Sequence, residues 1–167
     1  VHCKFTRNGQ SVMTRNGELT DECRKAIAGY MVAGTSLPAF GNPHPLSFMR
    51  LVPHQEAPTS LCWSFSNRSA LVRVPLGWLK HMDMAAKCNP LEKAQDKDFS
   101  YKQTFEWRAS DGFADTYLLM AALCCAARHG FEMPDALAVA EKTYVGLGVN
   151  IHDEKNRAVQ EALEQLP

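Results

Sequence analysis

Five prolines interrupt one short segment of the chain, and they constrain the fold more than any other sequence feature. They lie between residues 36 and 58, at Pro38, Pro43, Pro45, Pro53 and Pro58. Proline lacks the backbone donor that a helix interior or a central strand requires, so this segment is predicted to form turns and short pieces. Irregular segments of this kind often carry functional groups. Functional residues are therefore expected in and near this segment.

The patterns on both sides of the segment predict a mixture of helices and strands. A helix should begin near Thr20 and end at Gly34, because apolar residues recur between them at helical spacing. No regular strand–helix–strand rhythm is present, which favours the α+β class. The other predicted elements are turns at 8–9 and 16–17, strands at 1–7, 61–66, 70–74 and 103–107, and helices at 116–129 (capped by Asp115), 134–144 and 153–166.

Length, charge and cysteine usage exclude several classes of protein. The 167 residues are enough for one domain with a hydrophobic core, and the formal net charge of zero argues against a nucleic-acid partner. The longest apolar run, 117–127, is too short to cross a bilayer, so no membrane partner is expected. The six cysteines lack CxxC spacing, and the adjacent Cys124 and Cys125 are interpreted as reduced core residues of an apolar helix, so a cytoplasmic protein is predicted. Because the chain lacks an initiator methionine and begins within a predicted strand, we expect a fragment.

Charged residues in and after the proline-rich segment form a first group of candidate site residues. Arg50 precedes the loop, and Glu56 lies within it between two prolines. A carboxylate in a stiff loop can accept a proton. Arg68 and Arg73 carry guanidinium groups that suit phosphate or carboxylate oxygens, although they would face opposite ways in one extended strand. Taken singly, each of these residues is more simply interpreted as a solvent-exposed side chain.

A second group of candidates surrounds Trp107. Glu106 alternates with apolar neighbours, and Arg108 should lie on the same face as Glu106. Glu106 is a candidate metal ligand and Arg108 a candidate substrate contact, whereas the alternative is an exposed ion pair of little energetic weight. His2 is a further candidate ligand, because neutral imidazole often binds metals. A lone histidine near a terminus is, however, more often simply exposed.

The order of these motifs resembles the C-terminal part of the glutamine synthetase catalytic domain. The resemblance covers about residues 1–130 and implies an α+β fold with antiparallel strands flanked by helices. It also implies that 1–167 is a single, partial catalytic domain without its upstream half and its N-terminal β-grasp domain. The matching motifs are His2-Cys3-Lys4, Ile27-Ala28-Gly29, Asn42-Pro43, Met49 to Pro53, Glu56-Ala57-Pro58, Asn67-Arg68-Ser69, Arg73-Val74-Pro75, Glu106-Trp107-Arg108, Asp111 and Tyr117-Leu118.

Glutamine synthetases use ATP and Mg²⁺ or Mn²⁺ to join glutamate and ammonia through γ-glutamyl phosphate, and they form ring-shaped homo-oligomers. The resemblance implies a role for each candidate residue. His2 and Glu106 would bind the metal, and Arg50 and Arg108 the substrate. Glu56 would be the catalytic flap residue. Arg68 and Arg73 would bind the phosphate or nucleotide, and Arg68 would also be a catalytic residue.

Asp115-Thr116 replaces the usual Asn-Pro of the family, and three further substitutions depart from the family pattern. Lys4 replaces a histidine, and Ser66 and Thr104 stand where many members have arginine. These changes leave the amine substrate open, so a glutamyl-polyamine ligase relative is one alternative. Another is a catalytically dead relative used as a structural or interaction protein, and a third is a phosphate-binding module unrelated to enzymes. Because upstream metal ligands and a neighbouring subunit's domain complete the family's site, the isolated chain is expected to be inactive.

Overall fold

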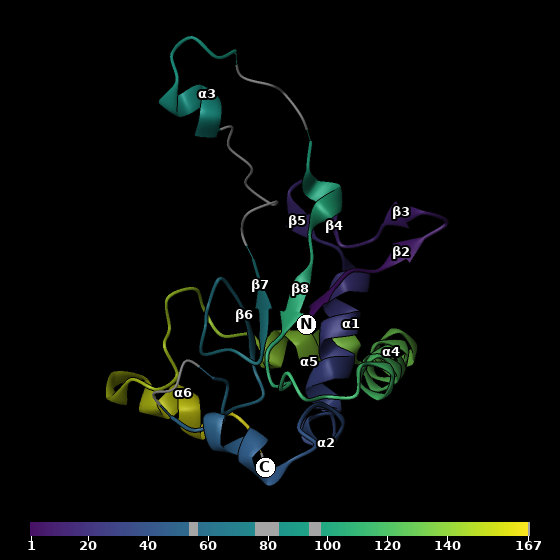
Figure 1. Ribbon diagram of the computed structural model, residues 1–167, viewed down its shortest axis with the longest axis vertical. Helices are drawn as coiled ribbons and strands as arrows, with labels where there is room; N and C mark the ends of the chain where they lie inside the picture. The colour runs from purple at the N-terminus through teal and green to yellow at the C-terminus, as the bar shows by residue number, and fades with distance from the viewer. Residues whose placement is uncertain (54–56, 76–83, 94–97, 167) are drawn as a thin grey trace.

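The computed structural model describes residues 1–53, 57–75, 84–93 and 98–166. Its centre is a four-stranded sheet in the order β1-β8-β7-β6, which combines with helices as the α+β prediction requires (Figure 1). No helix within the described ranges is long and apolar enough to span a membrane. The strands of the sheet are β1 (His2–Cys3), β6 (Trp63–Phe65), β7 (Val72–Val74) and β8 (Phe105–Trp107).

The predicted antiparallel pairing is found for β1–β8 and β7–β8, whereas β6 and β7 are parallel. Parallel neighbours usually need a long crossover, but only residues 66–71 separate these two strands. The short link suffices because each strand has three residues and is therefore about 10 Å long. Ser66 begins the link in the left-handed region, with φ of 47°, and turns the chain back.

Both predicted asparagine–glycine turns are confirmed. Asn8 and Gly9 have φ of 52° and 79°, and Asn16 and Gly17 have φ of 53° and 79°. Positive φ at both central residues is typical of the tight turn that matches strand twist. The predicted strand at 1–7 is therefore divided, because its second half joins a hairpin instead of the main sheet. The hairpin strands are β2 (Thr6–Arg7) with β3 (Gln10–Ser11), and β4 (Thr14–Arg15) with β5 (Glu18–Leu19).

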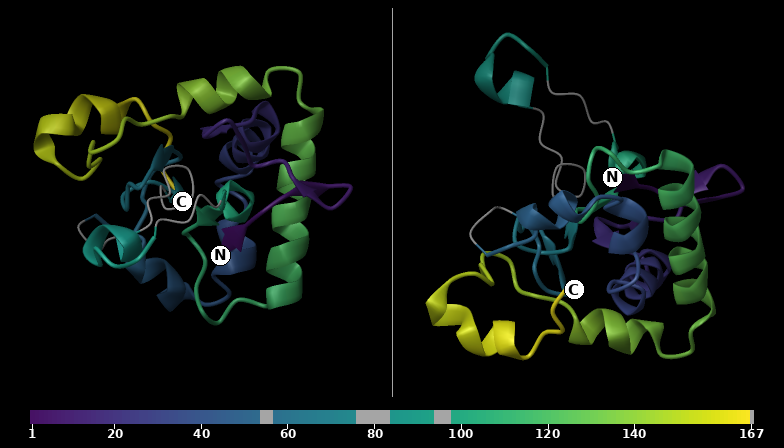
Figure 2. Two further views of the ribbon diagram at one scale, coloured as in Figure 1. Left: turned by 90° about the horizontal axis from the view of Figure 1, so that it is seen from above. Right: turned by 60° about the horizontal axis from the view of Figure 1, so that its bottom comes forward.

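The first long helix, α1 (Asp21–Val32), packs against α4 (Thr116–Glu132) and α5 (Ala136–Lys142). Figure 2 shows α4 and α5 on adjacent sides of α1. The predicted start of α1 is confirmed, since the Thr20 hydroxyl accepts a hydrogen bond from the backbone amide of Cys23 at 3.1 Å. The proline-rich segment forms only short pieces, as predicted. These pieces include the short helices α2 (Pro38–Gly41) and η1 (Pro45–Arg50). Two more short helices follow later in the chain, α3 (Met84–Cys88) and η2 (Ser100–Lys102), and Figure 1 shows α3 away from the sheet.

Two predicted helix ends are wrong, for tertiary reasons. Helix α4 continues past Gly130, because this glycine lies against the backbone of α1 instead of ending the helix. The predicted helix at 153–166 is only η3 (Glu154–Asn156) followed by α6 (Arg157–Glu161). The chain must leave the helix there, since the Leu61 amide donates to the Glu164 carbonyl at 2.7 Å and the Leu166 amide to the Thr59 carbonyl at 2.8 Å.

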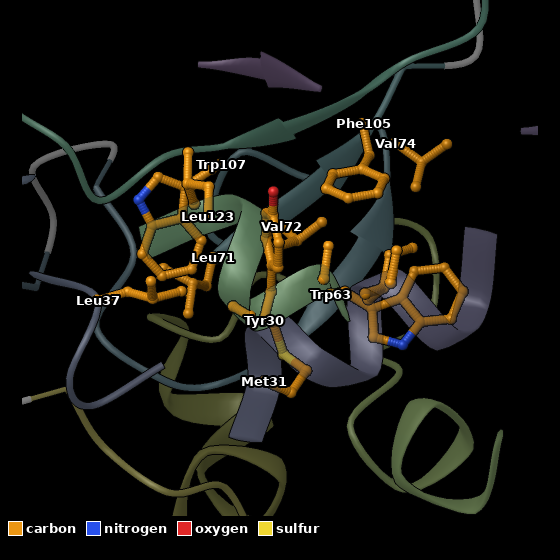
Figure 3. Close-up of a cluster of buried hydrophobic side chains, with 14 of the residues drawn as sticks. Tyr30, Met31, Leu37, Trp63, Leu71, Val72, Val74, Phe105, Trp107 and Leu123 are labelled. Atoms are coloured by element: carbon orange, nitrogen blue, oxygen red, sulfur yellow. The ribbon is translucent and has the colours of Figure 1, made fainter. Parts of the chain in front are cut away.

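The hydrophobic core lies between the sheet and α1, and it fixes the orientation of β8. Phe105 and Trp107 are almost completely buried, with relative exposures of 0% and 1%. Tyr30 of α1 packs edge-on against both rings, at centroid distances of 5.2 and 5.8 Å (Figure 3). Because side chains alternate along a strand, burial of Phe105 and Trp107 directs Glu106 to the opposite face of the sheet.

The N-cap of α4 allows a direct measurement of how much one capping side chain contributes to the stability of the domain. The Asp115 carboxylate accepts hydrogen bonds from the amides of Tyr117 and Leu118 at 2.9 and 3.0 Å. Asp115→Ala is expected to lower the free energy of unfolding by about 1 kcal/mol. Asp135, the N-cap residue of α5, makes no side-chain cap bond, so Asp135→Ala is the matched control. Equal effects of the two substitutions in urea denaturation would contradict this interpretation.

Candidate metal and phosphate site

Three candidate residues form one row across three strands. Glu106 on β8 is directly opposite His2 on β1 and directly opposite Arg73 on β7. Side chains of directly opposed residues lie close together on the same face of a sheet. The register therefore brings together residues that are far apart in the sequence. Arg108 comes two residues after Glu106, and its Nε lies 3.6 Å from the Glu106 carboxylate. The two side chains therefore lie on the same face, as the alternation predicted.

The two carboxylate oxygens of Glu106 face different partners. Oε2 lies 2.8 Å from Nε of Arg73 and 3.6 Å from Nε of Arg108, whereas Oε1 lies 4.0 Å from Nε2 of His2. The side chains of Arg73, Glu106 and Arg108 are 25%, 21% and 13% exposed, so water screens their charges less than at a free surface. The 2.8 Å contact is an ion pair without aligned hydrogen-bond geometry. We refer to His2, Arg73, Glu106 and Arg108 as the Glu106 cluster.

His2 has a second partner that the sequence did not indicate. Its Nδ1 lies 3.0 Å from the hydroxyl oxygen of Thr104, so the two ring nitrogens face different groups. The neighbouring Cys3 is partly buried, and the Tyr30 hydroxyl donates to its sulfur at 3.4 Å. Burial raises the pKa of the Cys3 thiol, so this cysteine stays neutral beside His2. All six cysteines are free thiols, but Cys124 and Cys125 are exposed, so the prediction that they are core residues is wrong.

Arg50 reaches the loop that follows β8. Its Nη2 donates hydrogen bonds to the carbonyls of Arg108 and Ser110, at 3.3 and 2.6 Å. The proposed substrate arginine is therefore brought next to the Glu106 cluster, and two backbone carbonyls hold it in place. A substrate carboxylate at Arg50 would have to use the remaining guanidinium nitrogens, which a five-donor group allows.

Arg68 lies in a separate open hollow of about 550 Å³. It precedes β7 in the 66–71 link, in agreement with the predicted strands at 61–66 and 70–74, so Arg68 and Arg73 do not share one extended strand. Arg73 and Glu106 are not among the described residues that line the hollow. Those lining residues are Ser66, Asn67, Arg68, Ser69, Leu147, Gly148, Asn150 and His152.

Buried hydrogen bonds fix the loop that carries Arg68. The Asn67 side chain donates to the Val149 carbonyl at 2.6 Å and accepts from the Ser69 amide at 3.0 Å. The Ser69 hydroxyl in turn accepts from the Ile151 amide at 3.3 Å. The segment around residue 150 thus forms the far wall of the hollow. Local sequence patterns do not indicate this wall, because it depends on hydrogen bonds between segments about 82 residues apart.

The predicted flap residue, Glu56, lies outside the described residues. The next residue along the chain, Ala57, is buried, and its carbonyl lies 3.2 Å from Nε2 of His152. Because His152 also lines the hollow, the end of the Glu56 loop at Ala57 lies beside the Arg68 hollow.

The metal-binding potential of the site rests on His2 and Glu106. A cation with ligand distances of about 2.1 Å can bridge two donors up to about 4.2 Å apart. The 4.0 Å between Nε2 of His2 and Oε1 of Glu106 falls within this limit. Within the described part of the chain, no group of three or more His, Cys, Asp or Glu side chains is placed to hold a metal. The donors present therefore fit part of a coordination shell.

Comparisons with known proteins agree on one family. The model of the family described as "Glutamine synthetase, catalytic domain" matches residues 1–165. Glutamine synthetase from Pyrococcus horikoshii is 28% identical over 167 residues, which are 100% of this chain and 32% of that protein. Glutamine synthetase from Neisseria gonorrhoeae is 32% identical over 134 residues, which are 79% of this chain and 24% of that protein.

A solved structure supports the same assignment. Plasmodium falciparum glutamine synthetase, determined by cryo-electron microscopy, superposes with a TM-score of 0.59 at 25% identity. The superposition covers 78% of this chain and 22% of that chain. The chain thus spans about a third or less of the length of these relatives.

Proposed function

This chain belongs to the glutamine synthetase family, and we propose that it is part of the catalytic domain of an ATP-dependent ligase that joins glutamate to ammonia or another amine. The observation that carries the proposal is the row of His2, Glu106 and Arg73 across the sheet. Phosphoryl transfer requires a metal-binding carboxylate and fixed positive groups where negative charge develops. The row supplies both kinds of group on one face of the sheet.

In this proposal ATP and Mg²⁺ or Mn²⁺ are the cofactors. His2 Nε2 and Glu106 Oε1 would hold a metal ion, which when bound neutralises phosphate charge. Arg73 faces the other oxygen of Glu106 and would bind phosphate oxygens from the β7 side. Arg68, on its anchored loop, would bind the transferred phosphoryl group. Arginine suits this task because its planar fork binds two oxygens at once.

The proposed reaction has two steps. The γ-carboxylate of glutamate attacks the terminal phosphorus of ATP, which forms γ-glutamyl phosphate and releases ADP. The amine then attacks the acyl carbon, and inorganic phosphate leaves with one former carboxylate oxygen. Arg50 and Arg108 would orient glutamate through its charged groups, and Glu56 would remove the proton from the ammonium ion.

The remaining expectations belong to the same proposal. Because the chain spans about a third or less of its relatives, we propose that other parts of the protein complete the site, and that this chain alone is inactive. We also propose that the whole protein is a ring-shaped homo-oligomer in the cytoplasm. The proposed partners are glutamate and the amine, without nucleic acid or membrane.

One observation favours a second candidate, a ligase for an amine larger than ammonia. Ser66, where many family members have arginine, lines the Arg68 hollow of about 550 Å³. A serine occupies less of such a hollow than an arginine would, and the space left suits a bulkier nucleophile. This alternative keeps the acyl-phosphate chemistry and changes only the amine. The other alternative, a catalytically dead relative with a structural role, would keep the Glu106 cluster only for its ion pairs and gives no use for His2 facing Glu106 Oε1.

The test is ATP-dependent phosphate release by the full-length gene product, with glutamate and a panel of amines from ammonium to diamines. We expect release that requires both glutamate and one class of amine, and the γ-glutamyl amide of that amine by mass spectrometry. The 167-residue chain, assayed beside it, is expected to be inactive. Absence of release from the full-length protein with every amine would favour the dead relative. Activity of the short chain would show that the site is complete without the rest of the protein.

A further inference from the structure

We propose that Thr104 is a positioning residue for the metal-binding histidine, and that its hydroxyl accepts a hydrogen bond from His2 Nδ1–H and so holds Nε2 toward Glu106. The inference rests on the proposed metal role of His2 and Glu106. It adds a residue that the resemblance assigns to no such task, since family members often have arginine at this position.

The geometry of the sheet places the three side chains together. His2 is directly opposite Glu106, and Thr104 comes two residues before Glu106, immediately ahead of β8. Residues two apart in an extended segment lie on the same face. The imidazole of His2 therefore has Thr104 Oγ1 at 3.0 Å from Nδ1 and Glu106 Oε1 at 4.0 Å from Nε2.

The tautomer of His2 decides whether it can bind a metal. A neutral imidazole carries one N–H, and the other nitrogen offers a lone pair. With the proton on Nδ1, the ring donates to Thr104, and the lone pair of Nε2 faces Glu106 Oε1. With the proton on Nε2, the hydrogen stands where a cation would bind, and the 4.0 Å separation is too long for a hydrogen bond to Glu106. The Thr104 hydroxyl can pair with Nδ1 in either tautomer, but once a cation takes the Nε2 lone pair the proton stays on Nδ1, and the hydroxyl accepts it and holds the ring in place.

The exchange of arginine for threonine has a clear chemical consequence. An arginine has five N–H donors and no acceptor, so it cannot accept a hydrogen bond from Nδ1–H. A threonine hydroxyl can. Because His2 is on a short edge strand and its side chain is 54% exposed, packing alone does little to fix its ring. A hydrogen bond to the second nitrogen is the usual means by which proteins orient a ligand histidine.

The test uses Mn²⁺ as the probe and the full-length protein without nucleotide. Free Mn²⁺ is measured by electron paramagnetic resonance, and the nitrogen coupling of a bound imidazole is measured by spin-echo modulation. We expect Thr104→Val to weaken Mn²⁺ affinity by about 10–100-fold and to reduce the nitrogen coupling, because the ring loses its orienting acceptor. Thr104→Ser keeps the hydroxyl and is expected to retain both signals.

Two further substitutions distinguish a failure of the proposed role of Thr104 from a failure of the proposed metal role of His2. Thr6→Val removes an exposed threonine hydroxyl on β2 and should change neither signal. Unchanged affinity and coupling in Thr104→Val would overturn the role of Thr104. If His2→Asn has the same affinity and coupling as the unmodified protein, the metal role of His2 itself is wrong, and the inference falls with it. Should Thr104→Val not fold, Thr104→Ala, which also lacks the hydroxyl, is compared with the serine variant.

Discussion

Replacing Gly130 by alanine is expected to destabilise the domain by about 3 kcal/mol, although alanine is normally the better helix former. A Cβ atom at Gly130 would lie 2.0 Å from the Lys25 carbonyl oxygen and 2.7 Å from the Gly29 nitrogen. Both are backbone atoms of α1, which cannot move aside as a side chain can. The two helices would have to separate, and the core beneath them would lose close packing.

Urea denaturation monitored by circular dichroism tests this prediction. Gly112→Ala is the matched control, because a Cβ there would meet nothing within 4 Å. We expect the control to change the free energy of unfolding by less than about 0.5 kcal/mol. A Gly130→Ala variant as stable as the unmodified chain would show that α1 and α4 are not in such close contact.

Replacing Glu106 by glutamine is expected to reduce the activity of the full-length protein at least about 100-fold. Glutamine keeps the shape of the side chain but removes the charge that faces Arg73, Arg108 and the proposed metal. The substitution should also lower stability by about 2 kcal/mol, because it leaves two partly buried guanidinium groups without their shared carboxylate.

Steady-state kinetics and denaturation measure the two effects separately. Glu132→Gln breaks the ion pair with Arg128, whose side chains are 80% and 62% exposed, and should change neither quantity noticeably. If Glu106→Gln retained full activity and full stability, the Glu106 cluster would be an incidental surface ion pair.

Local features of the fold could be predicted from the sequence because nearby residues determine them. The caps at Thr20 and Asp115 and the two asparagine–glycine turns depend on residues within one turn of chain, and all are present. Features decided by distant parts of the chain could not be predicted this way. The role of Gly130 depends on α1, and the early end of the last helix depends on residues 59–61.

The same distinction applies to the site. The alternation along β8 correctly placed Glu106 and Arg108 on one face, since a strand has a fixed two-residue period. The meeting of His2, Arg73 and Glu106 depends on strand register between distant segments, which single-strand patterns do not contain. The contact between His2 and Thr104 follows from the same register, and only the structure revealed it.

The most direct test of the account is to follow the oxygen atoms of glutamate. The full-length protein is supplied with ATP, an accepted amine, and glutamate whose γ-carboxylate carries a heavy oxygen isotope at both oxygen positions. If the γ-carboxylate is phosphorylated, each phosphate released must contain one labelled oxygen, because the bond to carbon breaks when the amine attacks. The account predicts labelled phosphate in equal amount to the amide formed. Unlabelled phosphate would show that ATP is cleaved by water, and it would contradict the assignment of this site to acyl-phosphate chemistry.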